Sequence, residues 1–428
     1  MKKDLLAILV LFIFLVGCGN EQEPPETEDD FMYTGTWSGE IEIPNQPLKI
    51  NVTLEEKEGA ISIPVQGVDK YPLNTIKTDK DNILFTMQIQ GQSITFDGKL
   101  DGGKIAGTFK QNGQSFPFIL TKGKASAAND EEDGTFLQME TEQGTLHGEL
   151  ERPEGEGPFP IMIIIPGSGP TDRNGNAATG KNNSLKYVAE ALAEEGIASL
   201  RYDKRGAGKN MAAARAEEDT DFNLFVEDAK AWIELLVQDD NYSKVGIIGH
   251  SQGSLTGMLA AQKGNVGVFV SLAGAGRSLD EVLYDQLSEQ LPKDLLKESK
   301  EILTQLKKGK TVEHVSQELQ SVFRPSVQPF LMSWMQYNPA AQIQKMDIPT
   351  LIVNGKNDLQ VPVCEAEILH EAKADADILL VEPMNHVLKE APEDRKGNIA
   401  TYSDPDLPLA KGLMDGILAF LKENEFTN

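Results

Sequence analysis

A serine flanked by glycines is the residue of this chain best placed to act as a nucleophile. Ser251 lies in Gly-His-Ser-Gln-Gly at 249–253, after the apolar run 244–248 and before a helix-forming segment at 255–261. A strand, a sharp turn and a helix in this order would expose the serine hydroxyl, and the two glycines permit the turn because they carry no Cβ. The pentapeptide alone is weak evidence for a nucleophile, since a chain this long contains such a match by chance about one time in five. Its position between a strand and a helix makes Ser251 the candidate nucleophile.

An activated serine needs a base and an acid that orients the base. His386 follows the apolar strand predicted at 378–381. Loops at the carboxyl ends of parallel strands line the crevice of doubly wound folds, so His386 is the expected base. Asp358 follows the strand predicted at 350–353 in the same way and is the expected acid. Glu382 is the alternative acid, but it lies where its strand is still ending.

The other four histidines and Cys364 are weaker candidates for catalytic groups. His147 lies in an early predicted strand, and His314 and His370 lie on polar stretches predicted to be helical. His250 precedes the serine, and we expect its side chain to point away from the reacting face. Cys364 has no reactive-cysteine motif around it, so we expect a packed small side chain.

The order Ser251, Asp358, His386 along the chain resembles that of the α/β-hydrolase superfamily. The resemblance covers roughly residues 146–422. It includes Pro-Gly-Ser-Gly-Pro at 166–170, similar to the family's His-Gly-x-Gly loop, and Asp-Lys-Arg-Gly-Ala-Gly at 203–208, similar to its Asp-x-Arg-Gly-x-Gly turn. Residues 167–175 further resemble a subgroup of bacterial carboxylesterases and serine-aminopeptidase-like enzymes. The chain departs from the pattern at two positions, which blur the subgroup but remove no catalytic side chain: Pro166 replaces the usual histidine, and Asn210 stands where a serine often occurs.

This resemblance implies a serine hydrolase that transfers an acyl group to water. Carried over by position, the backbone N–H groups of Ser168 and Gln252 would form the oxyanion hole. Carboxylic esters are the implied substrates, since alkoxides leave more easily than amines. An amidase, a peptidase, a thioesterase or an acyltransferase would share every one of these residues. In a different class, the chain could be a surface binding module with a silent hydrolase domain, although a complete Ser-Asp-His set argues against this.

The pattern along the chain predicts two domains that would position these groups. Residues 33–122 alternate apolar and polar residues between glycine turns, which is typical of a small antiparallel β-barrel or sandwich. We interpret this part as a spacer or substrate-presenting module in preference to a ligand-binding one. Residues 123–134 form a polar linker. Residues 135–428 contain continuous apolar runs separated by helical periods, which predict a doubly wound α/β sheet of parallel strands.

A helical insertion interrupts this second domain at about 277–345. Leucines recur there at helical spacing, so we expect a helical cap over the carboxyl ends of the strands. Its aromatic residues could wall an acyl pocket, but we favour their packing the cap against the sheet. These aromatic residues are Phe323, Phe330, Trp334 and Tyr337.

The amino terminus predicts export and lipid anchoring. Residues 1–17 begin with lysines and continue with an apolar stretch too short to span a bilayer comfortably, as in a signal peptide. Leu-Val-Gly-Cys at 15–18 resembles the lipobox of bacterial lipoproteins, which implies cleavage before Cys18 and acylation of that cysteine. The alternative is an ordinary signal peptide with an incidental cysteine. Residues 18–32 would be an acidic tether, and we expect the protein on the extracytoplasmic face of the cell membrane, held by its lipid only.

Charge and motif spacing limit the other partners. The net charge of −26 repels phosphate backbones, so we expect no nucleic-acid partner and a small acyl ester as the ligand. No His, Cys and carboxylate cluster has metal-ligand spacing. Residues 175–182 nearly spell a phosphate-binding loop, but Asn182 lacks the hydroxyl that Mg²⁺ requires there. We therefore expect no cofactor and no metal.

Overall fold

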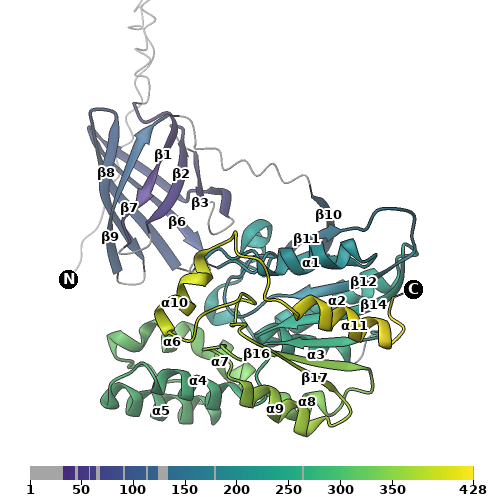
Figure 1. Cartoon of the computed structure of the whole chain (residues 1–428). Helices are drawn as coiled ribbons and strands as arrows, with labels where there is room; N and C mark the ends of the chain where they lie inside the picture. Colours follow the sequence, from purple (N-terminus) through teal and green to yellow (C-terminus); the bar gives the residue numbers. More distant parts are fainter. Residues whose placement is uncertain are drawn as a thin grey trace, which may run out of the picture.

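A computed structural model shows two sheets, one after the other along the chain (Figure 1). It describes residues 32–427 except 44–46, 57, 64–67, 90–91, 112–113, 124–133, 178–179 and 263–264. The predicted signal peptide, Cys18 and the predicted tether up to residue 31 lie outside the described residues. No helix in the described part has the length and apolar character needed to cross a bilayer.

The first sheet, here called the β domain, is a single curled antiparallel sheet (Figure 1). Its hydrogen-bonded order is β4-β3-β2-β1-β9-β8-β7-β6-β5. One curled sheet corresponds to the barrel-like alternative of the two that the sequence predicts. Its strands are β1 (Gly35–Ile41), β2 (Leu48–Leu54), β3 (Gly59–Ile63), β4 (Val68–Pro72), β5 (Thr75–Asp79), β6 (Asn82–Ile89), β7 (Gln92–Asp101), β8 (Lys104–Gln111) and β9 (Gln114–Lys122).

Side chains fill the concave side of the β domain. Phe85 stacks on Phe96 with ring centroids 4.7 Å apart, and Phe118 meets Phe96 edge-on at 5.3 Å. Trp37 is 1% exposed, and its indole N–H donates to the carbonyl oxygen of Tyr33 at 2.7 Å. These aromatic residues occupy the interior that a ligand would otherwise need, which supports a packed core there.

The second sheet is mixed and belongs to what we call the mixed-sheet domain. Its order is β10-β11-β13-β12-β14-β15-β16-β17, with antiparallel pairing from β10 to β13 and parallel pairing in the rest. The parallel part agrees with the doubly wound sheet expected from the apolar runs. The strands are β10 (Thr135–Thr141), β11 (Gly144–Glu151), β12 (Phe159–Ile165), β13 (Ala198–Tyr202), β14 (Tyr242–His250), β15 (Phe269–Leu272), β16 (Thr350–Gly355) and β17 (Asp377–Val381).

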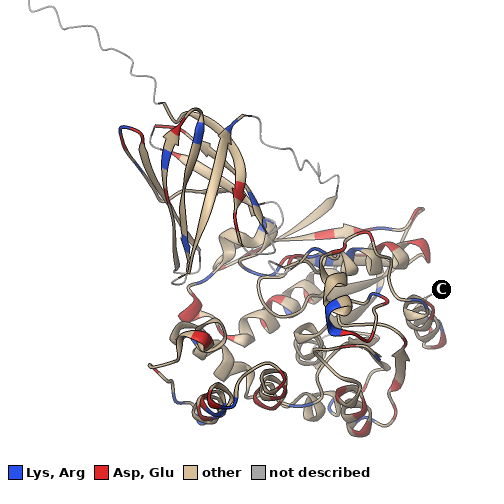
Figure 2. Ribbon diagram, turned by 60° about the vertical axis from the view of Figure 1, so that its left-hand side comes forward, with Lys and Arg blue, Asp and Glu red and all other residues tan. Residues whose placement is uncertain are grey.

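Helices cover both faces of this sheet. Along β12, Ile161, Ile163 and Ile165 join the apolar cluster of α2, α3 and α9, whereas Met162 and Ile164 join the cluster of α1 and α11. Because neighbouring side chains on a strand point to opposite faces, a strand buried on both faces must be apolar throughout. The helices are α1 (Ser184–Glu194), α2 (Phe222–Val237), α3 (Gln252–Ala261), α9 (Val363–Ala372), α10 (Arg395–Ala400) and α11 (Leu413–Glu423). Acidic residues are spread over several of the helices (Figure 2).

The segment between β15 and β16 is helical, as expected, and has an apolar core of its own. Ile302, Leu306 and Phe323 are almost completely buried in this core. The last helix, α8, packs on α3 and α9 instead and returns the chain to the sheet. The segment contains α4 (Leu279–Ser288), α5 (Lys293–Lys307), η4 (Gln317–Leu319), α6 (Gln320–Phe323), η5 (Pro325–Val327), α7 (Gln328–Trp334) and α8 (Pro339–Ile343).

A short helical turn of the mixed-sheet domain packs against the β domain. It is η2 (Gly208–Ala213), which contacts β4 of the β domain and β11 of the mixed-sheet domain. Met211 from η2 is 9% exposed and belongs to the apolar core of the β domain. The side-chain amide of Asn210, its neighbour, donates to the carbonyl oxygens of His147 at 3.1 Å and Asp203 at 2.7 Å. The β domain is therefore packed against the loop that follows β13.

Candidate active site

Ser251 occupies a strained turn between β14 and α3. Its φ of 55° and ψ of −119° are uncommon for a residue with a side chain. A Cβ on Gly249 would lie 2.3 Å from the carbonyl oxygen of Gly253, and one on Gly253 would lie 2.2 Å from that of Ile165. Glycine is therefore required on both sides of the serine, for the steric reason that the sequence suggests.

Three side chains that are distant in the sequence form one hydrogen-bonded chain. His386 Nε2 lies 3.1 Å from Ser251 Oγ, and His386 Nδ1 lies 2.8 Å from Asp358 Oδ2. A carboxylate only accepts, so Nδ1 carries the imidazole proton and Nε2 is free to accept from the hydroxyl. The other oxygen of Asp358 accepts the backbone N–H groups of Gln360 at 2.8 Å and Val361 at 2.9 Å. The structure thus brings together all three residues singled out in the sequence.

The alternative acid, Glu382, lies away from this chain of bonds. Its carboxylate is 67% exposed and pairs with Lys356 at 2.8 Å. The expectation of a packed Cys364 is wrong, because this cysteine is exposed on α9. His314 lies in an irregular exposed segment and not in the expected helix, whereas His370 is helical.

His250 holds the backbone of the candidate base, His386, through a hydrogen bond. Its Nε2–H donates to the backbone carbonyl oxygen of His386 at 2.9 Å, and the two ring centroids are 5.1 Å apart. Burial, together with the nearby His386, lowers the pKa of His250 to about 4, so the ring is neutral at pH 7. The sequence places His250 beside the nucleophile but does not reveal that it holds the loop of the base.

The loop containing Ser168 passes directly beside the nucleophile. A Cβ on Gly167 would lie 3.4 Å from Ser251 Cβ. Gln252 is the first residue of α3, where backbone N–H groups have no partner within the helix. The two residues expected to supply the oxyanion hole therefore lie on the two chain segments that border Ser251.

A buried lysine that sequence reasoning missed joins these same two segments. Lys204 Nζ donates to the Gly167 carbonyl oxygen at 3.1 Å and to the side-chain Oε1 of Gln252 at 2.6 Å. It is 5% exposed. Its place inside the Asp-x-Arg-Gly-x-Gly turn at 203–208 is the only sign in the sequence that could have singled it out.

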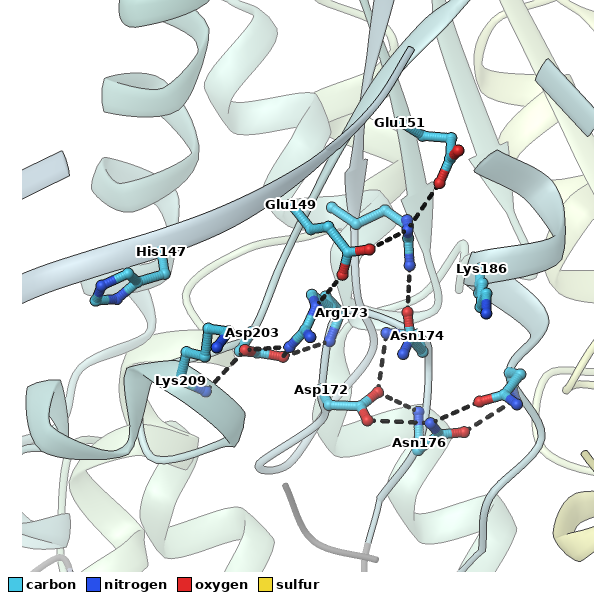
Figure 3. A network of polar contacts seen from close by, with 12 residues as sticks. His147, Glu149, Glu151, Asp172, Arg173, Asn174, Asn176, Lys186, Asp203 and Lys209 are labelled. Atoms are coloured by element: carbon cyan, nitrogen blue, oxygen red, sulfur yellow. Dashed lines mark hydrogen bonds and ion pairs between the residues drawn. The ribbon is translucent and has the colours of Figure 1, made fainter. Parts of the chain in front are cut away.

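A network of charged side chains fixes the Ser168 loop to the sheet (Figure 3). Arg173, at the far end of this loop, pairs with Glu149 of β11 and with Asp203 at 2.9 Å. Arg201 of β13 pairs with Glu149 at 3.2 Å and also contacts Asn174. Asp203 therefore fastens the loop after β13 to the loop that contains Arg173. Arg205 pairs with Asp228 of α2 at 2.7 Å.

Asp172, directly before Arg173, is a partly buried residue whose carboxyl group has a raised pKa. Asp172 accepts the backbone N–H groups of Asn174 at 2.9 Å and Asn176 at 2.8 Å (Figure 3). Burial and the nearby charge of Asp203 nevertheless raise the pKa of Asp172 above its ordinary value. These bonds shape the loop that begins at Gly167.

The aromatic side chains of the cap are mostly packed. Trp334 stacks on Phe222 of α2 with centroids 5.6 Å apart, and Tyr337 lies 5.7 Å from the same ring. Phe330 meets Phe225 edge-on at 5.9 Å. The contacts favour the packing interpretation, and they connect the cap to α2. Among the described residues, no group of three or more His, Cys, Asp or Glu side chains is arranged to hold a metal ion.

Comparisons with known proteins show what the mixed-sheet domain is similar to. Residues 181–388, which include Ser251, Asp358 and His386, match the family described as serine aminopeptidase, S33. Esterase EstD of Thermotoga maritima is 27% identical over 289 residues, which is 67% of this chain and 66% of that esterase. The match thus spans slightly less than two thirds of the relative's length.

Two solved structures were also matched. Est1E of Butyrivibrio proteoclasticus is 18% identical with a TM-score of 0.44, and the match covers 68% of this chain and 97% of that one. An esterase of Pyrococcus furiosus is 17% identical with a TM-score of 0.44, and the match covers 71% and 96%. By the family match and the esterase relative, the mixed-sheet domain is similar to carboxylesterase-like hydrolases of the α/β-hydrolase superfamily.

Proposed function

We propose that the protein cleaves carboxylic esters through an acyl-enzyme formed on Ser251. The observation that carries this proposal is the continuous chain of hydrogen bonds from Ser251 through His386 to Asp358. In this mechanism His386 Nε2 takes the hydroxyl proton as the oxygen attacks the acyl carbonyl. Asp358 holds the proton on Nδ1 and stabilises the imidazolium that forms. His386 then gives its proton to the leaving alkoxide, and the acyl group stays on Ser251.

Water completes the reaction by the same steps in reverse order. His386 removes a proton from the water, the hydroxide attacks the acyl-enzyme, and Ser251 leaves as its hydroxyl. In each half-reaction the carbonyl oxygen becomes negatively charged. The N–H groups of Ser168 and Gln252 would stabilise this charge, and the position of both segments beside Ser251 supports their role.

The choice of esters rests on relatives and on leaving-group chemistry. EstD is named an esterase, whereas the matched family is named for an aminopeptidase, so amides are the second candidate substrates. An alkoxide leaves from a tetrahedral intermediate without full protonation, but an amine needs it. We therefore expect ester cleavage to be the faster reaction in this site.

A matched ester and amide test the proposal. We expect the whole protein to hydrolyse p-nitrophenyl butyrate much faster than the corresponding p-nitroanilide. Ser251→Ala should lower the ester rate by at least about 10⁴-fold and leave the circular dichroism spectrum unchanged. Unchanged turnover in this variant would refute the assignment, and a faster anilide reaction would favour the peptidase alternative.

We further propose that the protein is held at the extracytoplasmic face of the membrane by a lipid on Cys18. The support is the lipobox-like sequence at 15–18 and the apolar stretch before it. Cells that express the chain should incorporate labelled palmitate into it, and Cys18→Ala should remove the label. If the Cys18→Ala protein still incorporated labelled palmitate, the lipid would be attached at another residue and this proposal would be wrong.

A further inference from the structure

Lys204 is a buried lysine in an unusual setting. It follows β13 and is 5% exposed, and its ammonium group lies 4.3 Å from the ring centroid of Phe225. Within the described part of the chain, it forms no ion pair with a carboxylate. An ammonium group buried in this way carries a desolvation cost, and burial lowers the pKa of Lys204 to about 7. A lysine here is costly for folding, which points to a role that an apolar side chain could not fill.

Its first hydrogen bond fixes a peptide group beside the nucleophile. The Gly167 carbonyl that accepts from Lys204 belongs to the same planar unit as the Ser168 N–H. In a trans peptide these two groups point in opposite directions, so holding the oxygen also sets the direction of the N–H. A cation on the oxygen also polarises the unit and makes the N–H a stronger donor. Gly167 lies against Ser251, so this control is exerted where the oxyanion would form.

Its second hydrogen bond fixes the other segment. Lys204 Nζ lies 2.6 Å from Oε1 of Gln252, whose backbone N–H begins α3 directly after Ser251. The Gln252 side chain is 4% exposed, and its Nε2 has no hydrogen-bond partner among the residues that the structure describes. The Lys204 amino group therefore binds both the Gly167–Ser168 peptide and the Gln252 side chain, from 37 and 48 positions away in the sequence.

We propose that Lys204 is the positioning residue of the oxyanion hole: it holds the Gly167 peptide and the Gln252 side chain so that the N–H groups of Ser168 and Gln252 face the developing oxyanion. This role rests on the proposed function of Ser251. In this role Lys204 contacts neither the substrate nor the reacting atoms. It acts through the two backbone donors.

Lys204→Met tests this role because methionine is unbranched and of similar length but donates no hydrogen bond. Losing one oxyanion donor costs about 10²–10³-fold in turnover, so donors that are present but misaligned should cost about 10–100-fold. We expect this fall in kcat for p-nitrophenyl butyrate, with KM changed less than about threefold, because the interaction forms only in the transition state. Lys209→Met is the matched control. It changes an exposed lysine of the same loop and should keep wild-type kcat.

A trifluoromethyl ketone provides a readout that a merely structural role would not move. Its adduct with Ser251 carries an oxyanion, so Lys204→Met should raise its inhibition constant by at least about tenfold. A folded Lys204→Met enzyme with kcat within about threefold of wild type would overturn the proposal. So would a loss confined to KM with unchanged inhibition by the ketone.

A second variant covers the case in which Lys204→Met does not fold. Gln252→Met removes the Oε1 acceptor but keeps the backbone N–H, and it should lower kcat about tenfold at unchanged KM. Wild-type kcat in this variant would then overturn the proposal. Failure of the ester mechanism itself is distinguishable, because the wild-type protein would then be inactive and Ser251→Ala would change nothing.

Discussion

The Asp358 carboxylate lies 2.8 Å from Nδ1 of His386 and is completely buried. Asp358→Asn keeps the shape of this side chain but can donate to Nδ1, which favours the wrong imidazole tautomer. Ester turnover should fall by about 10³–10⁴-fold with little loss of stability. Steady-state kinetics measures the effect. Glu382→Gln is the matched control, since it changes the alternative acid, and a larger loss in this variant would reverse the assignment.

The glycine after the nucleophile provides a steric prediction. Gly253→Ala would place a Cβ 2.2 Å from the Ile165 carbonyl oxygen, so the turn would have to shift. We expect the free energy of unfolding of the Gly253→Ala protein to fall by about 1–3 kcal/mol, and the variant to lose most of its ester activity. Gly123→Ala is the control, because its Cβ would meet no atom within 4 Å. Chemical denaturation and kinetics report both effects, and equal behaviour of the two variants would contradict this explanation of the turn.

His250 gives a prediction for acid stability. Its pKa is about 4 in the folded chain against 6.5 as the ordinary value, so the unfolded chain binds more protons between these limits. The stability that neutral His250 contributes is therefore present above pH 6.5 and is lost as the pH falls towards 4. His250→Gln keeps a donor without this titration. Urea denaturation at pH 7 and 4.5 should show a smaller loss in the variant, and an equal loss would show that other groups dominate.

Met211 tests the contact between the two domains. It lies on η2 of the mixed-sheet domain but is buried in the core of the β domain. Met211→Asp would bury an unpaired carboxylate there, and we expect a destabilisation of about 2–4 kcal/mol. Met32→Asp is the control, since Met32 is 49% exposed. Thermal unfolding compares the variants, and equal melting temperatures would mean that the domains separate readily.

The sequence predicted the strands and the candidate triad because both depend on local pattern. Continuous apolar runs indicate strands buried on two faces, and residues at the carboxyl ends of parallel strands meet at one edge of the sheet. This reasoning placed Asp358 and His386 near Ser251. In the structure His386 lies within hydrogen-bonding distance of Ser251, and Asp358 within hydrogen-bonding distance of His386.

The supporting contacts could not be predicted because they depend on packing between distant segments. Lys204 follows β13, and nothing in its neighbours shows that its side chain turns inward to Gly167 and Gln252. The bond from His250 to the His386 carbonyl and the insertion of Met211 into the β domain are of the same kind. Cys364 lies exposed on α9, and its neighbours in the sequence do not show which side of the helix it occupies.

A fluorophosphonate probe tests the central claim most directly, because it reacts with a serine only when a base activates it. The account predicts one adduct per chain by intact mass, mapped by peptide sequencing to Ser251, and none on Ser251→Ala. A folded wild-type protein that takes up no probe, or takes it up at a different residue, would contradict the account.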